Sequence, residues 1–249
     1  MKRLISHALV MIALMLLWQG LSAGLGLSKL VLPEPARVIQ AWWRGWQTGY
    51  FTPHLWQTVQ ELALGLTLGA VMGLGGGVIL AEVPWLKRLA MPYVVISQVV
   101  PKLALAPLFM VWFGLGMTST VVIVALICFF PLLESTLTAV TQVDAQRLDL
   151  FRMLGAGRWQ TLWRLKIPAG LPGILAGLRV AVVLALVGAV VGEFIGANQG
   201  LGAVIIASQG MMDTALMFAT LINITALGLL LYGCTLLLEQ QLLQHHPSS

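Results

Sequence analysis

Five charged side chains interrupt otherwise apolar stretches of this chain, and they are the first candidates for chemistry. They are Glu61, Lys102, Glu134, Arg179 and Glu193. Ionisable groups are costly inside a bilayer, so such residues usually face the interior of a helix bundle or a water-filled cavity. Glu61, Glu134 and Arg179 lie near the ends of their apolar stretches, and we expect them to form ion pairs or to lie at the membrane interface.

Lys102 and Glu193 are the candidates for a solute pathway. Lys102 stands between Pro101 and Pro107, and two residues without a backbone N–H leave carbonyl groups free to line a cavity. A lysine in such a cavity attracts an anionic or polar ring-shaped solute, or it pairs with Glu193. We favour pairing, because a strongly held charge hinders release of a cargo. Glu193 precedes a glycine-rich turn, which favours a gating or structural role for it.

The sequence contains no recognisable catalytic or metal-binding set. His54, His245 and His246 have no ligand neighbours at metal-site spacing, and Cys128 and Cys234 lie within apolar runs. No Gly-x4-Gly-Lys-Ser/Thr loop is present, so the chain has no cradle for nucleotide phosphates. We therefore expect that the chain is not an enzyme and binds no metal or cofactor.

The composition indicates that these residues belong to a membrane protein. Of 249 residues, 59% are hydrophobic and 9% charged, whereas a soluble domain is about 25% charged. The predicted fold class is therefore all-α and polytopic. A spanning helix needs about 20 apolar residues, and six such segments can be marked. They are Leu4–Leu25, Trp56–Ala81, Tyr93–Phe113, Ser119–Val140, Leu171–Ile195 and Thr214–Leu238.

Two of these segments need comment. The third holds Pro101, Lys102 and Pro107, which predicts a broken or kinked helix lined by protein. The first follows Lys2 and Arg3 and resembles a signal peptide, but its apolar run is long and further spans follow. We favour a retained first helix.

The distribution of basic residues predicts the orientation. With a cytoplasmic N-terminus, the inner segments hold nine Lys and Arg and the outer segments three, as the positive-inside rule requires. Six spans then return the C-terminus to the cytoplasm. The net charge of +5 is thus explained by the lipid membrane, and nucleic acid is not an expected partner.

The long outer segment and the small residues predict how the helices are arranged. After Pro33-Glu34-Pro35 we expect a short amphipathic helix whose tryptophans are interfacial anchors. Small residues recur every four positions in the second and fifth spans, which predicts close helix crossings. We expect these stripes to need a second copy of the chain, with contacts along the fifth span near Ala185. The stripes are Gly65, Gly69, Gly73 and Gly77; Gly173, Gly177, Ala181, Ala185 and Ala189; and Gly188, Gly192, Gly196 and Gly200.

The cytoplasmic segment Thr141–Pro172 is too polar to span a membrane. Asp144 is a candidate helix cap, Gly155-Ala156-Gly157 interrupts the first helix, and Pro168 is expected to end a second. The pattern predicts a helix–turn–helix hairpin on the membrane face. From periodicity alone, a lipid-binding amphipathic hairpin remains equally possible.

The same segment resembles the EAA motif of ABC-importer permeases. It reads Asp149-Leu150-Phe151, then Gly155 four residues later, then Leu165-Lys166-Ile167-Pro168. Leu150 and Phe151 depart from the two small residues of that motif. The resemblance extends from about Thr58 to Leu238 and is greatest to the nitrate/sulfonate/taurine group, with the Pro101-Lys102 wording similar to permeases for thiamine-precursor pyrimidines and related heterocycles.

The resemblance implies a type I ABC importer permease fold, with residues 1–249 as one permease domain, a core of about 56–238 and a coupling loop of about 141–172. It also implies a homodimer in the bacterial inner membrane, two cytoplasmic ATPase subunits that bind ATP and Mg²⁺, and an extracytoplasmic solute-binding protein. The residues implied in ATPase coupling are Asp149, Leu150, Phe151, Gly155, Ala156, Arg158, Ile167 and Pro168, and those proposed for the pathway are Pro101, Lys102, Pro107 and Glu193. The alternative function is a stand-alone secondary transporter or channel, although the paired broken helices typical of many such transporters are not evident.

Overall fold

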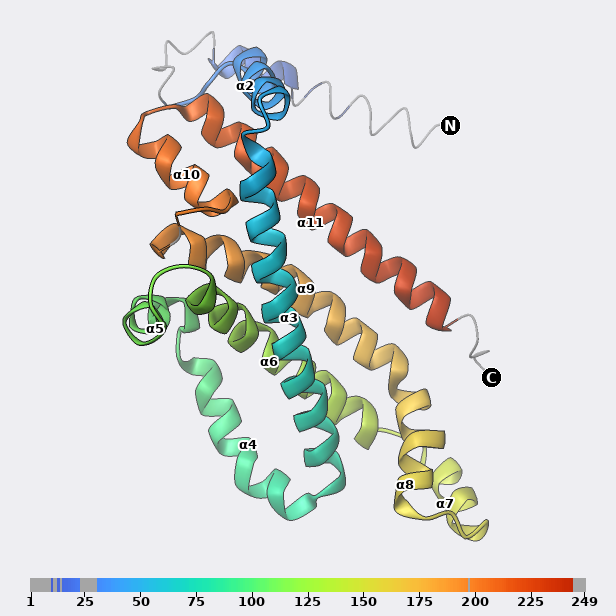
Figure 1. Ribbon diagram of the computed structural model, residues 1–249. Helices are drawn as coiled ribbons and strands as arrows, with labels where there is room; N and C mark the ends of the chain where they lie inside the picture. Colours follow the sequence, from blue (N-terminus) through green and yellow to red (C-terminus); the bar gives the residue numbers. More distant parts are fainter. Residues whose placement is uncertain (1–9, 11–12, 14, 23–30, 197, 244–249) are drawn as a thin grey trace.

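A computed structural model describes residues 10, 13, 15–22, 31–196 and 198–243, and its secondary structure in these ranges is helical (Figure 1). Apolar runs with few breakers explain the long elements, and glycine, proline or a cap residue marks most boundaries. The elements are α2 (Pro35–Gln47), α3 (Phe51–Glu82), α4 (Pro84–Val99), η1 (Lys102–Leu105), α5 (Ala106–Phe113), α6 (Met117–Thr141), α7 (Ala145–Met153), α8 (Arg158–Thr161), η2 (Leu162–Lys166), α9 (Ile167–Gly196), α10 (Leu201–Gly210) and α11 (Thr214–Leu243).

Five of the six predicted spans correspond to described elements. Four helical stretches are long and apolar enough to cross a membrane: α3, α6, Arg158–Gly196 and α11. The third predicted span is the bent pair Pro84–Val99 and Lys102–Phe113, with an angle of 79° between its halves, so the predicted break is confirmed. Of the first predicted span, residues 15–22 are helical, whereas residues 4–9, 11–12, 14 and 23–25 lie outside the described residues. The all-α, polytopic prediction is confirmed.

The predicted end of a helix at Pro168 is wrong. The helix continues from Arg158 to Gly196, and both Pro168 and Pro172 lie inside it. Immediately before Pro168 the backbone widens into the π-helical turn η2. A proline has no N–H and its ring clashes with the carbonyl one turn earlier, and a π-turn is one way in which a helix accommodates such a defect. The second arm of the cytoplasmic hairpin is therefore a direct extension of α9.

The glycine stripes pack helices together within this chain. A Cβ at Gly73 would lie 2.6 Å from the Phe129 carbonyl oxygen and 2.8 Å from the Leu132 Cβ, so α3 and α6 touch at their backbones. On the other side of α6, a Cβ at Gly192 would lie 2.8 Å from the Thr120 Cγ2. Ala185 is fully buried. The expected close crossings are confirmed, but the expectation that the stripes need a second copy is wrong, because α3, α6 and α9 satisfy them.

The outer helix α2 is attached to α11 by its tryptophans. The expected amphipathic helix after Pro35 is present. Trp42 and Trp46 both donate their indole N–H to Asn223 Oδ1, at 2.9 and 3.1 Å, while Trp43 is 58% exposed. Two of the three tryptophans are therefore attached to α11. Trp46 is still 37% exposed, so the interfacial interpretation fits Trp43 and Trp46 but not Trp42.

Helix α10 was not expected from the sequence. Gly200, read as part of a stripe, has a φ of +122° and forms the turn before α10. Asp213 precedes α11 and accepts the Leu216 N–H at 2.9 Å, which caps the start of that helix. Together these turns give α9, α10 and α11 their three directions (Figure 1).

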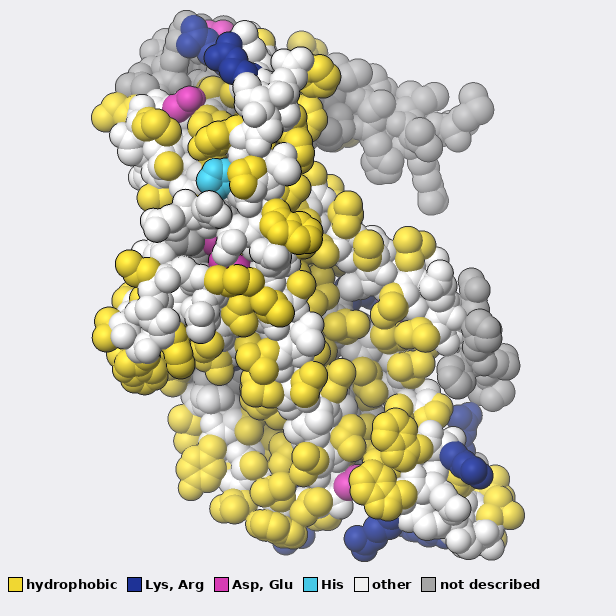
Figure 2. All heavy atoms as spheres, in the orientation of Figure 1, with side chains coloured by type: hydrophobic (Ala, Val, Ile, Leu, Met, Phe, Trp, Pro, Cys, Tyr) yellow, Lys and Arg dark blue, Asp and Glu magenta, His cyan; other side chains and the backbone are white. Residues whose placement is uncertain are grey.

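Charged and apolar side chains occupy different parts of the surface (Figure 2). Apolar side chains cover most of the face between the two ends of the molecule, and Lys and Arg side chains gather at those ends. One end carries α2, and the other carries the α3–α4 corner and the hairpin of α7 and α8 (Figure 1). This distribution fits a body embedded in lipid with two water-facing ends.

Candidate coupling site and translocation path

The cytoplasmic segment folds as the predicted helix–turn–helix hairpin. Asp144 caps α7 by accepting the Gln146 N–H at 3.0 Å. Gly155 then takes a φ of +69°, a conformation that L-residues with a side chain rarely adopt. The Gly157 N–H donates to Gln160 Oε1 at 3.1 Å, which helps to start α8. Local hydrogen bonds thus define a compact element between α6 and α9.

The hairpin exposes apolar side chains at the charged end of the molecule. Five residues are at least half exposed: Leu150, Met153, Leu154, Trp159 and Trp163. By contrast, Leu162 and Leu165 are buried and anchor the base of the element. An apolar group of this kind outside the lipid-facing body is typical of a surface that contacts another protein.

Some residues of the EAA-like stretch lie on the exposed side of the hairpin, and others lie where the hairpin meets α3 and α9. Asp149 pairs with Arg152 at 2.9 Å on the exposed side of α7, and Phe151 is partly buried. Ala156 and Arg158 line a cavity of about 520 Å³ between the hairpin and the α3–α4 corner. Ile167 and Pro168 lie at the start of α9.

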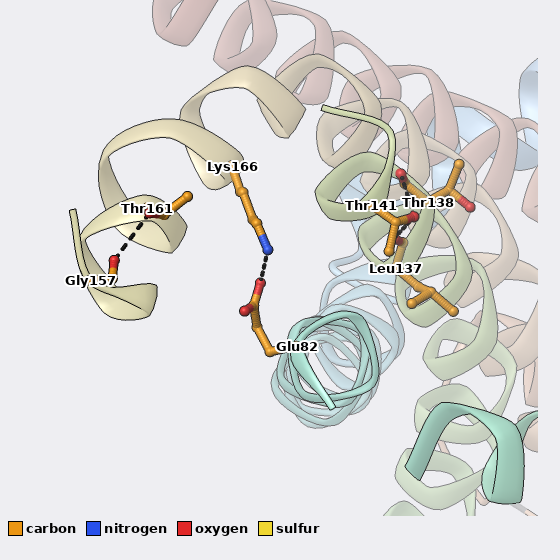
Figure 3. A network of polar contacts seen from close by, with 7 residues as sticks. All are labelled: Glu82, Leu137, Thr138, Thr141, Gly157, Thr161 and Lys166. Atoms are coloured by element: carbon orange, nitrogen blue, oxygen red, sulfur yellow. Dashed lines mark hydrogen bonds and ion pairs between the residues drawn. The ribbon is translucent and has the colours of Figure 1, made fainter. Parts of the chain in front are cut away.

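An ion pair fastens the hairpin to α3 (Figure 3). Lys166 Nζ lies 2.5 Å from Glu82 Oε1, and the two side chains are only 20% and 22% exposed. Glu82 is the last residue of α3, and Lys166 is the last residue of the π-turn. In the same region Thr161 Oγ1 donates to the Gly157 carbonyl at 3.1 Å (Figure 3). The sequence analysis did not identify this pair.

The broken span places Lys102 at its bend. Lys102 starts η1, and Pro107 occupies the first turn of α5, where a missing N–H does no harm. Lys102 Nζ donates to Gln98 Oε1 at 3.0 Å and lies 5.8 Å from the centre of the Phe130 ring. Pro101 is exposed. The favoured pairing of Lys102 with Glu193 is therefore wrong: the lysine finds its partners within its own bent span and on α6.

Glu193 instead belongs to a buried polar cluster. Its carboxylate accepts from Thr58 Oγ1 and from the Gly202 N–H, each at 2.6 Å. We expected Glu61 near the end of a span. Since α3 begins at Phe51, Glu61 instead lies well inside the helix, and it is fully buried. The sequence does contain a signal for this cluster in its spacing, because Gln57, Thr58 and Glu61 share one face of a helix.

Of the other two charged residues, Arg179 behaves as expected. Arg179 pairs with Glu239 of α11, which confirms an ion-pairing role. Glu134 is exposed on α6. Among the described residues, no group of three or more His, Cys, Asp and Glu side chains is placed to hold a metal ion.

Comparison with known proteins agrees with this architecture. The chain is 35% identical over 235 residues to the riboflavin transport system permease protein of Chloroflexus aurantiacus, covering 94% of this chain and 88% of that protein. It is 34% identical to the formylaminopyrimidine transport permease protein of Halalkalibacterium halodurans, covering 94% and 93%.

A solved structure shows the same fold. A chain of the inward-facing MetNI methionine ABC transporter superposes with a TM-score of 0.71 at 18% identity, covering 79% of this chain and 97% of that one. The similarity supports the type I importer permease fold, and the two permease relatives described above do not favour a stand-alone transporter. Residues 65–244 match the family of binding-protein-dependent transport system inner membrane components, and the chain belongs to that family as a multi-pass permease subunit of an ABC importer.

Proposed function

We propose that the hairpin of α7 and α8 is the docking element for a cytoplasmic ATPase that supplies the energy for import. The observation that carries this proposal is the exposed apolar group on the hairpin, from Leu150 to Trp163. The hairpin continues into α9 without a break and is tied to α3 by Lys166 and Glu82. A displacement of the hairpin by a bound partner is therefore transmitted to two spanning helices.

We propose the rest of the importer from the family to which the chain belongs. ATP and Mg²⁺ bind to the ATPase, which hydrolyses the nucleotide, and an extracytoplasmic binding protein delivers the solute to the opposite end of the bundle. Two copies of the chain, each a single permease domain, form the pathway, with Pro101, Lys102 and Pro107 at its bend. The hairpin end and both termini are cytoplasmic, in agreement with the excess of Lys and Arg there.

The turn at Gly155 provides the test of ATPase docking. Val at position 155 is incompatible with a φ of +69°, so Gly155→Val should insert in the membrane but retain little ATPase on co-purification and little uptake. Gly157→Val is the matched control, because Gly157 has a φ of −70° and open space around it. Full ATPase association and full uptake in Gly155→Val would exclude the coupling role.

We propose a small heterocycle as the cargo. The two relatives described above are named for riboflavin and formylaminopyrimidine, and Lys102 beside Phe130 offers a cation and an aromatic face to a polar ring. A thermal-shift assay of the binding protein encoded nearest to this chain tests the class. Stabilisation by riboflavin or a pyrimidine is expected, and stabilisation by taurine alone would contradict it.

A further inference from the structure

Two carboxyl groups from different spanning helices meet inside the bundle. Glu61 of α3 is 0% exposed and Glu193 of α9 is 1% exposed. Thr58 lies one helical turn before Glu61 on α3 and donates to Glu193 at 2.6 Å, so the two carboxyl groups are neighbours. Of the ion pairs between described residues, none involves either carboxylate. Two adjacent, buried negative charges without a cation are strongly unfavourable.

The hydrogen bonds around Glu193 favour it as the charged member of the pair. Its Oε1 accepts from Thr58 Oγ1 and its Oε2 from the Gly202 N–H, both at 2.6 Å. Bonds this short are characteristic of an ionised acceptor. Thr58 Oγ1 in turn accepts the Leu201 N–H at 2.9 Å. Oε2 faces a backbone N–H, which can only donate. Oε1 faces the Thr58 hydroxyl, whose single hydrogen lies nearer to Glu193, at 2.6 Å, than to the His54 carbonyl oxygen, at 3.1 Å. Two donors favour the charged form of Glu193 over that of Glu61, which has one.

Glu61 has one oxygen that lacks a donor. Its Oε1 accepts from Gln57 Nε2 at 2.7 Å, whereas Oε2 is buried and has no hydrogen-bond partner. The nearby Thr120 hydroxyl donates to the Gly116 carbonyl at 3.3 Å. A buried acceptor without a donor is unfavourable, and more so when it is charged. A hydrogen on Oε2 would convert this atom from an acceptor without a partner into a donor.

We propose that Glu61 and Glu193 form a proton-binding site that holds one proton at neutral pH, with the Glu61 O–H donating to the Glu193 carboxylate. The bound proton fastens α3 to α9 and to the turn that starts α10. The turn fits the pair closely: a Cβ at Gly200 would collide with the Glu193 carboxyl group. His54, the other titratable group in the cluster, accepts the Gly200 N–H through Nδ1 at 3.2 Å and supports the same turn.

Infrared difference spectra of the whole importer test for the proton directly. The spectrum of the native complex minus that of Glu61→Gln at neutral pH should contain the carbonyl band of a protonated carboxylic acid. Native minus Glu134→Gln, which removes an exposed carboxylate of α6, should contain no such band. If Glu61→Gln does not insert, the native spectrum minus that of Glu193→Gln must show the same acid band shifted, because its acceptor has been replaced.

Melting temperatures provide the second measurement. A Gln at position 61 donates an N–H where the acid donated its O–H, so its Tm should stay within about 2 °C of the native value. Glu193→Gln loses the charged acceptor of two short bonds and should melt lower than Glu61→Gln.

Three results would overturn the proposal. The first is the absence of an acid band in the native protein. The second is a higher Tm in Glu61→Gln, which indicates that two like charges were relieved. The third is a native Tm that rises with Na⁺ or K⁺ at constant ionic strength, with the effect lost in Glu61→Gln, which indicates a bound cation in place of the proton.

Discussion

Each charged side chain described inside the bundle has a particular partner, and the partners decide its role. Lys102 is held by Gln98 and the Phe130 ring, whereas Glu193 is held by Thr58 and the Gly202 N–H. Neither set of contacts includes the other residue. Lys102 therefore remains free to serve a solute at the bend, while Glu193 serves the packing of helices.

At the residue scale, this separation predicts that Lys102→Met and Glu193→Gln act independently. Glu193→Gln should lower the Tm, and Lys102→Met should lower uptake with little change in Tm. Because the two residues share no contact, their effects on the free energy of unfolding should add within about 0.5 kcal/mol. The measurement is a double-mutant cycle on the purified protein, with Lys102→Arg as the charge-preserving control. A double variant that is more stable than Glu193→Gln alone would show that Lys102 and Glu193 interact, as an ion pair requires.

At the scale of elements, the contact of α3 with α6 depends on glycine at particular positions. Gly73 and Gly75 lie two residues apart on the same helix but face different surroundings. A Cβ at Gly73 would meet the Phe129 carbonyl oxygen at 2.6 Å, whereas a Cβ at Gly75 would meet nothing within 4 Å.

Gly73→Ala should therefore push the two helices apart and destabilise the protein by about 1–3 kcal/mol. Gly75→Ala, the matched control, should be neutral or should stabilise the helix by up to about 1 kcal/mol. Thermal unfolding in detergent measures both changes. Equal Tm values for the two variants would show that the backbone contact at Gly73 is not important for stability.

The ion pair between α3 and the hairpin predicts a second effect on elements. Lys166→Met and Glu82→Gln should each uncouple ATP hydrolysis from uptake, because the hairpin loses its attachment to α3. Exchange of the two residues, Lys166→Glu with Glu82→Lys, should recover part of the uptake. Arg37→Gln is the control: its pair with Glu34 spans 3.8 Å and its side chain is 53% exposed, so the stability should change by less than about 1 kcal/mol. Unchanged coupling in both single variants would contradict the attachment.

The success of the sequence predictions differed between elements for physical reasons. Long apolar runs identified α3, α6 and α11, because the bilayer demands a fixed length of apolar helix. Pro168 was misread because the sequence does not show that a π-turn absorbs the missing N–H. Helix α10 was missed because ten residues between glycines carry little periodic signal. The hairpin was predicted correctly because Asp144 and Gly155 act locally.

The contacts between helices were less predictable than the helices themselves. Composition places Glu61 in an apolar stretch, but only the packing of α3 against α9 brings it to Glu193. The same applies to Lys166 and Glu82, which are 84 residues apart. The residues of the EAA-like stretch could be located from the motif, whereas the ion pair that supports the hairpin could not.

At the scale of the whole molecule, the bent pair of α4 and α5 is not fully covered by other parts of the described chain. Helix α4 contributes no buried residue, and the bent pair of α4 and α5 exposes both its apolar side chains and its break. Irregular backbone is not tolerated against lipid tails and must be covered by protein or line a water-filled path. By contrast, the glycine stripes are already filled within the chain, and Ala185 is fully buried. The second copy is therefore expected on the side of α4 and α5.

Cross-linking distinguishes this surface from the one that the small-residue stripes suggested. Val99 and Val111 are 82% and 81% exposed on the two halves of the bent pair. In a background in which Cys128 and Cys234 are replaced by Ala, cysteine at Val99 or Val111 should form a disulfide-linked dimer in an active preparation. Ala185→Cys should form none, because a thiol there is enclosed by the neighbouring helices of its own chain. A dimer linked through position 185 and absent at both valines would place the second copy against α9, and the break at Lys102 would then need water as its only cover.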